Sequence, residues 1–234
     1  MSSRIVAIIQ ARLGSARLPA KALRSLAGRP MISHVVERVR AVRGLSDILL
    51  ATSMNEQDGA LETFSRRLSL KVWRGSEWDV LGRLRDAAAW ADADVIMRVT
   101  GDCPLFAPDV AEAALSRYNN SHATNIYTWN DTAASGYPDG TDVEIFSRGL
   151  LESANAHAVG RLDREHVTPW IRRNFPVETL RSDIDYSAFK LSVDRLADLE
   201  FVEAITARLA VPFDLTLAAT MAAARSVVQE AREP

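Results

Sequence analysis

Three cations lie close together near the start of the chain. The stretch from residue 8 to residue 21 reads IIQARLGSARLPAK, and after its apolar beginning it contains Arg12, Arg17 and Lys21. Arginine and lysine bind phosphate oxygens through charge-assisted hydrogen bonds. Basic side chains are also common in loops simply because water solvates them, so these cations alone make the stretch a candidate anion site.

The small residues between these cations add a second kind of donor. Backbone N–H groups around Gly14 and Ser15 are expected to cradle phosphate oxygens, while Arg12 and Lys21 neutralise the β- and γ-phosphates. The stretch contains neither of the two common glycine-rich nucleotide motifs, G-x-G-x-x-G and G-x-x-x-x-G-K-[ST]. The residue types therefore predict a nucleotide site built on a different loop.

Two carboxylates complete the candidate site. Asp102 follows the apolar stretch DVIMRVTG, and Asp194 ends the stretch FKLSVD. Ligands of open α/β sheets bind beyond the carboxyl ends of the strands, so both carboxylates are expected near the basic loop. Mg²⁺ on a nucleotide triphosphate takes one or two protein carboxylates and completes its shell with phosphate and water. Either aspartate could instead cap the turn that follows it.

Alternating strands and helices must position these side chains. Apolar runs of strand length alternate with amphipathic segments up to residue 118, which predicts an α/β fold with a mixed, mostly parallel sheet and helices on both faces. The predicted strands are 5–9, 47–52, 70–75 and 94–102, and the predicted helices are 31–42, 61–68, 80–90 and 108–118.

The alternation stops after residue 118. Residues 119–146 are rich in Thr, Asn, Gly and Asp, with strand-like runs at 124–129 and 141–146, and are predicted to form a small inserted β-rich lobe. The rest is predicted to form helices at 147–158, 163–174, 199–209 and 215–230 and a strand at 189–194. A length of 234 residues suits one domain, 1–234, that carries this lobe.

The overall composition excludes several classes of function. The net charge is −2 and the isoelectric point is about 6.1, which argues against a general nucleic-acid-binding protein. Cys103 is the single cysteine, so neither a disulfide framework nor a thiolate metal cluster is expected. No apolar run has the length of a membrane span, and the chain begins without the apolar core of a signal peptide. These features predict a cytoplasmic protein without membrane contact.

Five ordered motifs resemble a known enzyme family. QARLGSARLPAK resembles the A-R-x-x-S-x-R-L-P-x-K signature of the cytidylyltransferases that activate acidic sugars as CMP derivatives. RVTGDCPL, YPDGTDVEIFSR, REHVTPWIRRN and LSVDRLADLEF resemble blocks of the branch called spore-coat polysaccharide biosynthesis proteins, which is similar to the acylneuraminate and ketodeoxyoctulosonate cytidylyltransferases. The resemblance covers roughly residues 4–205. It implies a nucleotide-diphospho-sugar transferase fold whose inserted lobe serves the substrate site and a homodimer contact.

The resemblance implies a role for each charged residue of the candidate site. Arg12 and Lys21 match the family's triphosphate-binding Arg and Lys, and Arg17 matches a further basic residue of that loop. Asp102 matches the family's metal-binding Asp, and Asp194 matches a second metal carboxylate. Mg²⁺ is therefore the implied cofactor.

Three positions depart from the family pattern. Ala16 and Ala20 stand where Thr and Gly are common, so the loop is less polar and less pliant. Thr100 stands where octulosonate-type relatives have a base-reading Gln. We therefore expect Thr100 to contact the base, with a preference for pyrimidine triphosphates and weak discrimination between CTP and UTP.

Four further residues are candidates for the sugar site. Asp139, Asp142 and Glu144 lie in PDGTDVE, which is a favourable turn sequence, and the resemblance adds the alternative that they bind the substrate. His166 lies in REHVT, where a hydrogen bond on a helix face and a contact with the sugar are equally good interpretations.

These features predict a Mg²⁺-dependent nucleotidyltransferase that couples an acidic sugar to CTP, giving pyrophosphate and a CMP-sugar for surface polysaccharide or glycan biosynthesis. Arg12, Lys21 and Asp102 are the predicted catalytic residues: the cations stabilise the leaving pyrophosphate, and Asp102 holds the metal. The general base is left open between metal activation of the sugar hydroxyl and a carboxylate of the inserted lobe. The alternatives are a metal-dependent glycosyltransferase of related fold and a nucleotide-binding subunit without turnover.

Overall fold

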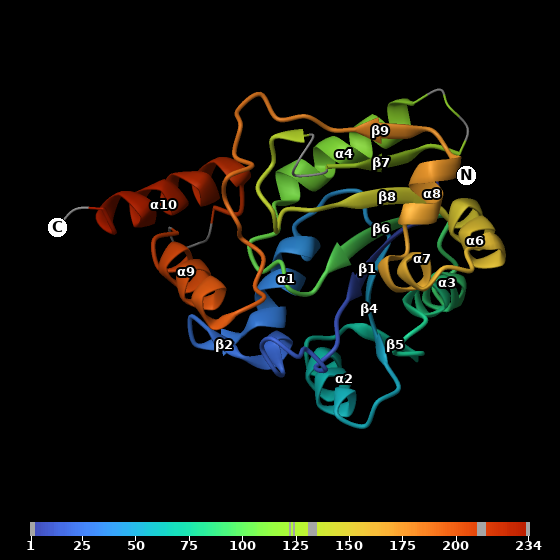
Figure 1. Cartoon of the computed structure of the whole chain (residues 1–234), viewed down its shortest axis with the longest axis horizontal. Coiled ribbons are helices and arrows are strands. Elements are labelled where there is room, and N and C mark those ends of the chain that lie inside the picture. Colours follow the sequence, from blue (N-terminus) through green and yellow to red (C-terminus); the bar gives the residue numbers. More distant parts are fainter. Residues whose placement is uncertain (1–2, 122, 124, 131–134, 210–213, 233–234) are drawn as a thin grey trace.

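A seven-stranded mixed sheet forms the centre of the molecule (Figure 1). The computed structural model describes residues 3–121, 123, 125–130, 135–209 and 214–232. From edge to edge the strands are β5 (Lys71–Gly75), β4 (Asp47–Ser53), β1 (Ile5–Gln10), β6 (Val95–Thr100), β8 (Glu144–Ser147), β7 (Tyr127–Trp129) and β9 (Val177–Thr179). Among these strands only β8 runs antiparallel to its neighbours. The predicted α/β class with a mostly parallel sheet is confirmed.

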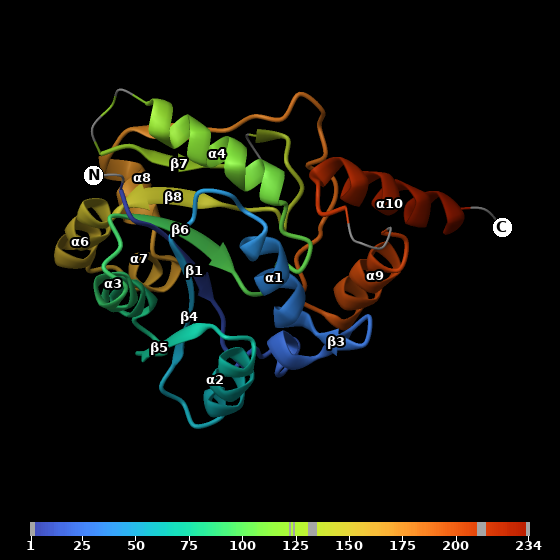
Figure 2. The same ribbon diagram turned by 180° about the vertical axis from the view of Figure 1, so that it is seen from behind.

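Helices cover both faces of this sheet (Figures 1 and 2). One face carries α1 (Met31–Arg40), α2 (Asp58–Arg67) and α4 (Pro108–Asn120), and the other carries α3 (Val80–Trp90), α6 (Arg148–His157) and α8 (Pro169–Asn174). The central strand β1 is apolar at consecutive positions because each face must pack: Ala7 and Ile9 face the first group, and Val6 and Ile8 face the second.

A third hydrophobic cluster lies beyond the carboxyl ends of the strands. It joins α9 (Leu196–Thr206) and α10 (Leu217–Glu230), which stand beside the sheet in Figure 1, to Leu26 of the two-residue strand β2 (Ser25–Leu26). Strand β2 pairs with β3 (Arg29–Pro30). Leu191 and Val193 also belong to this cluster. The chain that leads to Asp194 is therefore anchored by apolar burial on both sides of Ser192.

The predicted strand at 189–194 is wrong. This segment makes one isolated bridge, between Asp139 and Lys190, and otherwise runs along two loops. The N–H of Leu191 donates to the carbonyl of Asp139 at 2.7 Å, and that of Val193 donates to the carbonyl of Asp102 at 2.8 Å. Because its partners belong to two different loops, the segment has no continuous strand with which to form a ladder.

The predicted helix at 163–174 is interrupted. It forms two short helices, α7 (Arg161–His166) and α8, separated by Val167 in a positive-φ conformation (φ 72°). Pro169 occupies the first turn of α8, where its missing N–H needs no partner. The break turns α8 onto the sheet and leaves His166 at the end of α7.

Residues 119–146 contribute β7 and β8 to the edge of the main sheet that also carries β9. The predicted strand at 124–129 is seen as Tyr127–Trp129; Thr124, like positions 122 and 131–134, lies outside the described residues. The predicted strand at 141–146 is seen as Glu144–Ser147. In the part of the chain that the structure describes, no helix has both the length and the apolar character to cross a membrane.

Candidate active site

The loops that follow β1 and β6 are pressed against each other at the carboxyl edge of the sheet. The N–H of Gly101 donates to the carbonyl of Gln10 at 2.8 Å. A Cβ atom on Gly101 would lie 2.5 Å from the Cβ of Ala11, so a side chain at this position would push the two loops apart. Glycine here lets the basic loop and Asp102 share one cleft.

The basic loop is held in place by a buried carboxylate and a left-handed residue. Asp58, fully buried at the start of α2, accepts from the N–H of Leu13 at 2.7 Å and also from the hydroxyl of Ser53. The N–H of Ala20 donates to the carbonyl of Leu13 at 3.1 Å and closes the loop. Ala20 has φ 55° and ψ 26°, a conformation that favours glycine. A glycine would adopt this conformation at lower cost than alanine.

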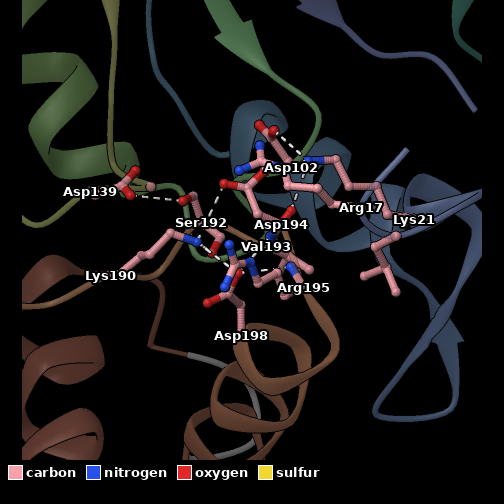
Figure 3. A network of polar contacts seen from close by, with 12 residues as sticks. Arg17, Lys21, Asp102, Asp139, Lys190, Ser192, Val193, Asp194, Arg195 and Asp198 are labelled. Atoms are coloured by element: carbon pink, nitrogen blue, oxygen red, sulfur yellow. Dashed lines mark hydrogen bonds and ion pairs between the residues drawn. The ribbon is translucent and has the colours of Figure 1, made fainter. Parts of the chain in front are cut away.

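The ammonium of Lys21 joins the two predicted metal carboxylates (Figure 3). Its Nζ lies 2.8 Å from Oδ2 of Asp102, 3.1 Å from Oδ1 of Asp194 and 2.8 Å from the carbonyl oxygen of Val193. The Lys21 side chain is only 14% exposed. Asp102 and Asp194 therefore converge on one cation, although Asp194 does not follow a strand.

Further cations surround Asp194. A guanidinium nitrogen of Arg17 lies 2.8 Å from Oδ1 of Asp194. The Nζ of Lys190 lies 3.4 Å from Oδ2 of Asp194 and 2.7 Å from a carboxylate oxygen of Asp198. Burial alone would raise the pKa of Asp194, but these cations, Lys21 first among them, outweigh burial and lower it below its ordinary value. Burial likewise opposes the charge of Lys21, yet its two carboxylate partners raise its pKa.

A cleft of about 450 Å³ opens above these groups. Nine of the residues predicted from the sequence line it: Arg12, Gly14, Ser15, Arg17, Lys21, Thr100, Asp102, His166 and Asp194. The N–H of Ser15 donates to the carbonyl of Leu13 at 2.8 Å, so in this conformation it serves the loop itself. A contact between that N–H and phosphate stays a prediction.

Two residues of this site were missed from the sequence. Glu77 accepts from a guanidinium nitrogen of Arg12 at 2.9 Å, and so aims this predicted phosphate ligand. Arg83 lines the cleft from α3, is 2% exposed, and donates to the carbonyl of Ser76 at 2.7 Å; burial lowers its pKa to about 10. In the sequence, Arg83 interrupts the apolar residues at the start of the predicted helix, and this was the available signal. The structure shows that its neighbours on α3, including Leu84, are buried.

A second cavity of about 340 Å³ shares Arg98 and Thr100 with the first. It is further lined by Trp129, Asn130, Asp142, Val143, Glu144 and Arg172. The guanidinium carbon of Arg172 lies 4.3 Å from the centroid of the Trp129 ring, an arrangement that is typical of a cation–π contact. The hydroxyl of Thr100 contacts the sulfur of Cys103 at 3.0 Å, so its contact with a base stays a prediction.

The three acidic residues of PDGTDVE have different environments. Asp139 accepts from the hydroxyl of Ser192 at 2.9 Å and pairs through its backbone with residues 189–191. Glu144 is paired with Arg98, its register partner across β6 and β8, and accepts from the hydroxyls of Tyr127 and Thr168, each at 2.8 Å. Asp142 accepts a hydrogen bond of 3.3 Å from the N–H of Gly140 and lines the second cavity.

Replacing Glu144 by Gln is expected to destabilise the fold by about 3 kcal/mol, because it leaves the guanidinium of Arg98 without its counter-charge in a site shielded from water. Urea unfolding at pH 7 measures the loss. Burial raises the pKa of Glu144, but Arg98 outweighs it and brings the pKa below its ordinary value. The stabilisation by ionised Glu144 is therefore present above its unfolded-state pKa and is lost as the pH falls through its folded-state pKa. The difference in unfolding free energy between Glu144→Gln and the wild type should consequently shrink in acid.

Glu152→Gln is a matched control for that prediction. Glu152 forms an exposed pair with Arg148 on α6, at 3.6 Å, and such pairs contribute at most about 1 kcal/mol. Equal losses in Glu144→Gln and Glu152→Gln would show that Glu144 is not a structural anchor.

The two converging carboxylates suit a hard divalent cation whose shell is completed from outside the protein. Among the described residues, no group of three or more His, Cys, Asp or Glu side chains comes together in a way that could hold a metal ion. Asp102 and Asp194 are two oxygen ligands, the number that Mg²⁺ commonly takes from a protein when it also binds phosphate and water. The donor set therefore fits Mg²⁺ carried by a nucleotide.

Comparison with known proteins agrees with this geometry. The chain matches the family model described as "Cytidylyltransferase" over residues 6–208. It is 30% identical over 211 residues to the spore coat polysaccharide biosynthesis protein SpsF of Bacillus subtilis, covering 86% of this chain and 85% of that protein. It is 35% identical over 113 residues to a 3-deoxy-manno-octulosonate cytidylyltransferase of Geobacter metallireducens, covering 48% of this chain and 44% of that protein.

A solved structure gives the same assignment. The structure of a cytidylyltransferase from Leptospira borgpetersenii has a TM-score of 0.87 and 25% sequence identity to this chain, and the match covers 98% of this chain and 95% of that one. The family resemblance carried by the five motifs is confirmed, and the chain belongs to the cytidylyltransferase family and is a nucleotidyltransferase.

Proposed function

We propose that this protein transfers the cytidylyl group of CTP to a hydroxyl of an acidic sugar, giving a CMP-sugar and pyrophosphate. The observation that carries the proposal is the Lys21 ammonium between Asp102 and Asp194, in a cleft that also contains Arg12 and Arg17. Cations beside paired carboxylates suit a triphosphate with its metal. The names of the relatives support the substrate class, since one makes an activated acidic sugar and another acts in polysaccharide biosynthesis.

The first cavity is the proposed nucleotide site. Arg12, aimed by Glu77, and Lys21 bind the β- and γ-phosphates and stabilise the charge that grows on the departing pyrophosphate. Arg17 is 60% exposed and adds a further cation at the mouth of the cleft. Gly14 and Ser15 shape the loop against the phosphates, and Thr100 lies beside the base or the α-phosphate at the junction with the second cavity.

Asp102 and Asp194 are the proposed Mg²⁺ ligands. When bound, Mg²⁺ supplies positive charge beside the α-phosphate and so lowers the cost of the negative charge that develops there. The Lys21 ammonium contacts both carboxylates in the present structure. When the metal and the nucleotide bind, it neutralises the triphosphate in place of these carboxylates. The two carboxylates thereby orient the cationic groups of the cleft as well as the metal.

The second cavity is the proposed acceptor site. Among the described residues Arg172 forms no ion pair, and its guanidinium lies over Trp129 at the cavity wall, where it can bind the acidic group of a sugar. Asp142 and Glu144 line this cavity, His166 lines the first, and Asp139 supports the segment that carries Asp194. We further propose a single domain whose segment 119–146 serves the acceptor site and a homodimer contact, acting in the cytoplasm in surface polysaccharide or glycan biosynthesis.

Pyrophosphate release tests this function. The assay takes CTP, UTP, ATP and GTP with Mg²⁺ and a panel of acidic and neutral sugars that includes 3-deoxy-manno-octulosonate and N-acetylneuraminate. We expect pyrophosphate only when a pyrimidine triphosphate and an acidic sugar are both present. A glycosyltransferase would instead consume a nucleotide-sugar and release no pyrophosphate, and a binding subunit would bind CTP without turnover.

A further inference from the structure

Within the described part of the chain, Asp142 differs from the other carboxylates of both cavities in having no cationic partner. Lys21 pairs with Asp102 and Asp194, and Arg98 pairs with Glu144. Among the described residues Asp142 is in no ion pair, and its contact is the 3.3 Å hydrogen bond from the N–H of Gly140. A carboxylate that is held by a single weak bond keeps its remaining lone pairs for something else in the cavity.

Asp142 lies at the wall of the cavity that is the proposed acceptor site. It precedes β8 by two residues and lines the second cavity, which joins the first through Arg98 and Thr100. Thr100 ends β6, two residues before Asp102. A sugar in the second cavity would therefore present a hydroxyl between Asp142 and the phosphates of a nucleotide in the first.

Burial, together with neighbouring negative charges, makes Asp142 a better proton acceptor than an ordinary aspartate. Burial raises its pKa to about 7, and Asp139 and Glu144 of its own segment, together with Asp102 from the loop after β6, act in the same direction. Asp142 in turn helps to raise the pKa of the Cys103 thiol, after burial and Asp102. The cations of the cavity wall are Arg98, whose donors are used by Glu144 and Gln10, and Arg172 over Trp129. General bases work best when their pKa lies near the working pH.

We propose that Asp142 is the general base that activates the acceptor hydroxyl. The inference rests on the proposed function. A carboxylate oxygen of Asp142 takes the proton of the sugar hydroxyl, the sugar oxygen forms a bond to the α-phosphorus, and the bond from that phosphorus to the bridging oxygen breaks. The electron pair leaves with pyrophosphate, and the proton passes from Asp142 to solvent afterwards. Glu144 cannot serve this step because Arg98, Tyr127 and Thr168 occupy its oxygens.

Thermal unfolding tests the proton affinity without any acceptor. A carboxyl whose folded-state pKa is raised to about 7 destabilises the fold increasingly as the pH rises from its ordinary value of 3.8, because the unfolded state ionises first. Asp142→Asn is therefore expected to leave the melting temperature nearly unchanged at pH 4 and to raise it by several degrees at pH 8. Asp185→Asn, at an exposed aspartate whose pKa the contact with Ser187 lowers, is the control and should show no gain that grows with pH. The same Tm difference at pH 4 and pH 8 for Asp142→Asn overturns the inference.

Steady-state kinetics tests the catalytic step. The assay contains CTP, Mg²⁺ and the acidic sugar of the panel that supports the fastest release of pyrophosphate by the wild type. Asp142→Asn should lower kcat about 10² to 10⁴-fold, abolish the acid limb of the kcat–pH profile and leave the Kd of CTP within about twofold. Formate should restore part of the activity of Asp142→Gly, which a purely structural residue would not allow. If the wild type turns over and Asp142→Asn keeps the same rate and pH profile, the inference alone is overturned. Activation of the sugar hydroxyl is then assigned to the metal. Failure of the wild type with every sugar overturns the proposed function, and the inference with it.

Discussion

Asp194→Asn is expected to lower Mg²⁺-dependent turnover about a thousandfold while the protein remains folded. The substitution keeps the shape of the side chain and removes one of the two negative charges that contact Lys21. A metal ion beside a transferring phosphoryl group contributes several kcal/mol to the transition state, and about 4 kcal/mol corresponds to a thousandfold in rate. The fold should survive because Lys21 keeps its contacts with Asp102 and the carbonyl of Val193. Pyrophosphate release as a function of Mg²⁺ concentration measures the loss.

Asp102→Asn should have an effect of the same size, and the double variant should lose little more than either single one. Residues that act as one unit are not additive, because the second substitution removes nothing that the first left working. Asp185→Asn is the matched control, since Asp185 is an exposed aspartate of the segment that leads to Asp194 and contacts Ser187. Near-wild-type turnover in either Asp102→Asn or Asp194→Asn, or losses that multiply in the double variant, would show that the two carboxylates do not share a metal.

The position of Asp194 was predicted correctly from an incorrect element. The alternating apolar residues Leu191 and Val193 indicated a strand, and the carboxyl end of a strand is where ligands of α/β sheets bind. The structure instead buries both side chains against α9 and α10 and ties the backbone to Asp102 and Asp139. The hydrophobic pattern thus gave the direction of the side chains, which is the same for a strand and for an extended loop. It could not give the partner of the backbone.

The strands β1 and β6 were predictable because both are apolar at consecutive positions, and their ends located the basic loop and Asp102. The pairing of Arg98 with Glu144 was not predictable. It depends on the antiparallel register of β6 with β8, two strands separated by more than forty residues of sequence. The available signals were a charge inside the apolar strand β6 and another at the start of β8, but the sequence does not say which opposite charge neutralises each of them.

The environments of Asp139, Asp142 and Glu144 illustrate the same limit of sequence patterns. The motif placed all three together as turn formers or substrate ligands, and nothing in its spacing distinguishes them. Their difference comes from partners far along the chain: Ser192 for Asp139 and Arg98 for Glu144. The three-dimensional structure shows that, among the residues it describes, Asp142 lines the second cavity without a cationic partner.

Lys21→Met is expected to weaken the binding of CTP about ten- to a hundredfold and to change the binding of CMP little. Methionine keeps most of the length and volume of the side chain and removes its charge. A hydrogen bond to a charged group contributes about 1.5–3 kcal/mol, which corresponds to this range of affinity. CMP lacks the β- and γ-phosphates that the Lys21 ammonium is proposed to neutralise, so its affinity should depend mainly on contacts elsewhere in the cleft. Calorimetric titration of each nucleotide in the presence of Mg²⁺ gives both constants.

Lys190→Met separates this specific role from a general change in the charge of the cleft. Lys190 also contacts Asp194, at 3.4 Å, but its shorter contact, at 2.7 Å, is with Asp198. Its removal takes away the same unit of charge at the same carboxylate without removing the cation that bridges Asp102 and Asp194. We therefore expect Lys190→Met to weaken CTP binding only a few-fold. If Lys21→Met weakened CTP and CMP equally, or if both lysine variants weakened CTP to the same degree, the ammonium of Lys21 would be a structural partner of the two carboxylates and not a ligand of the triphosphate.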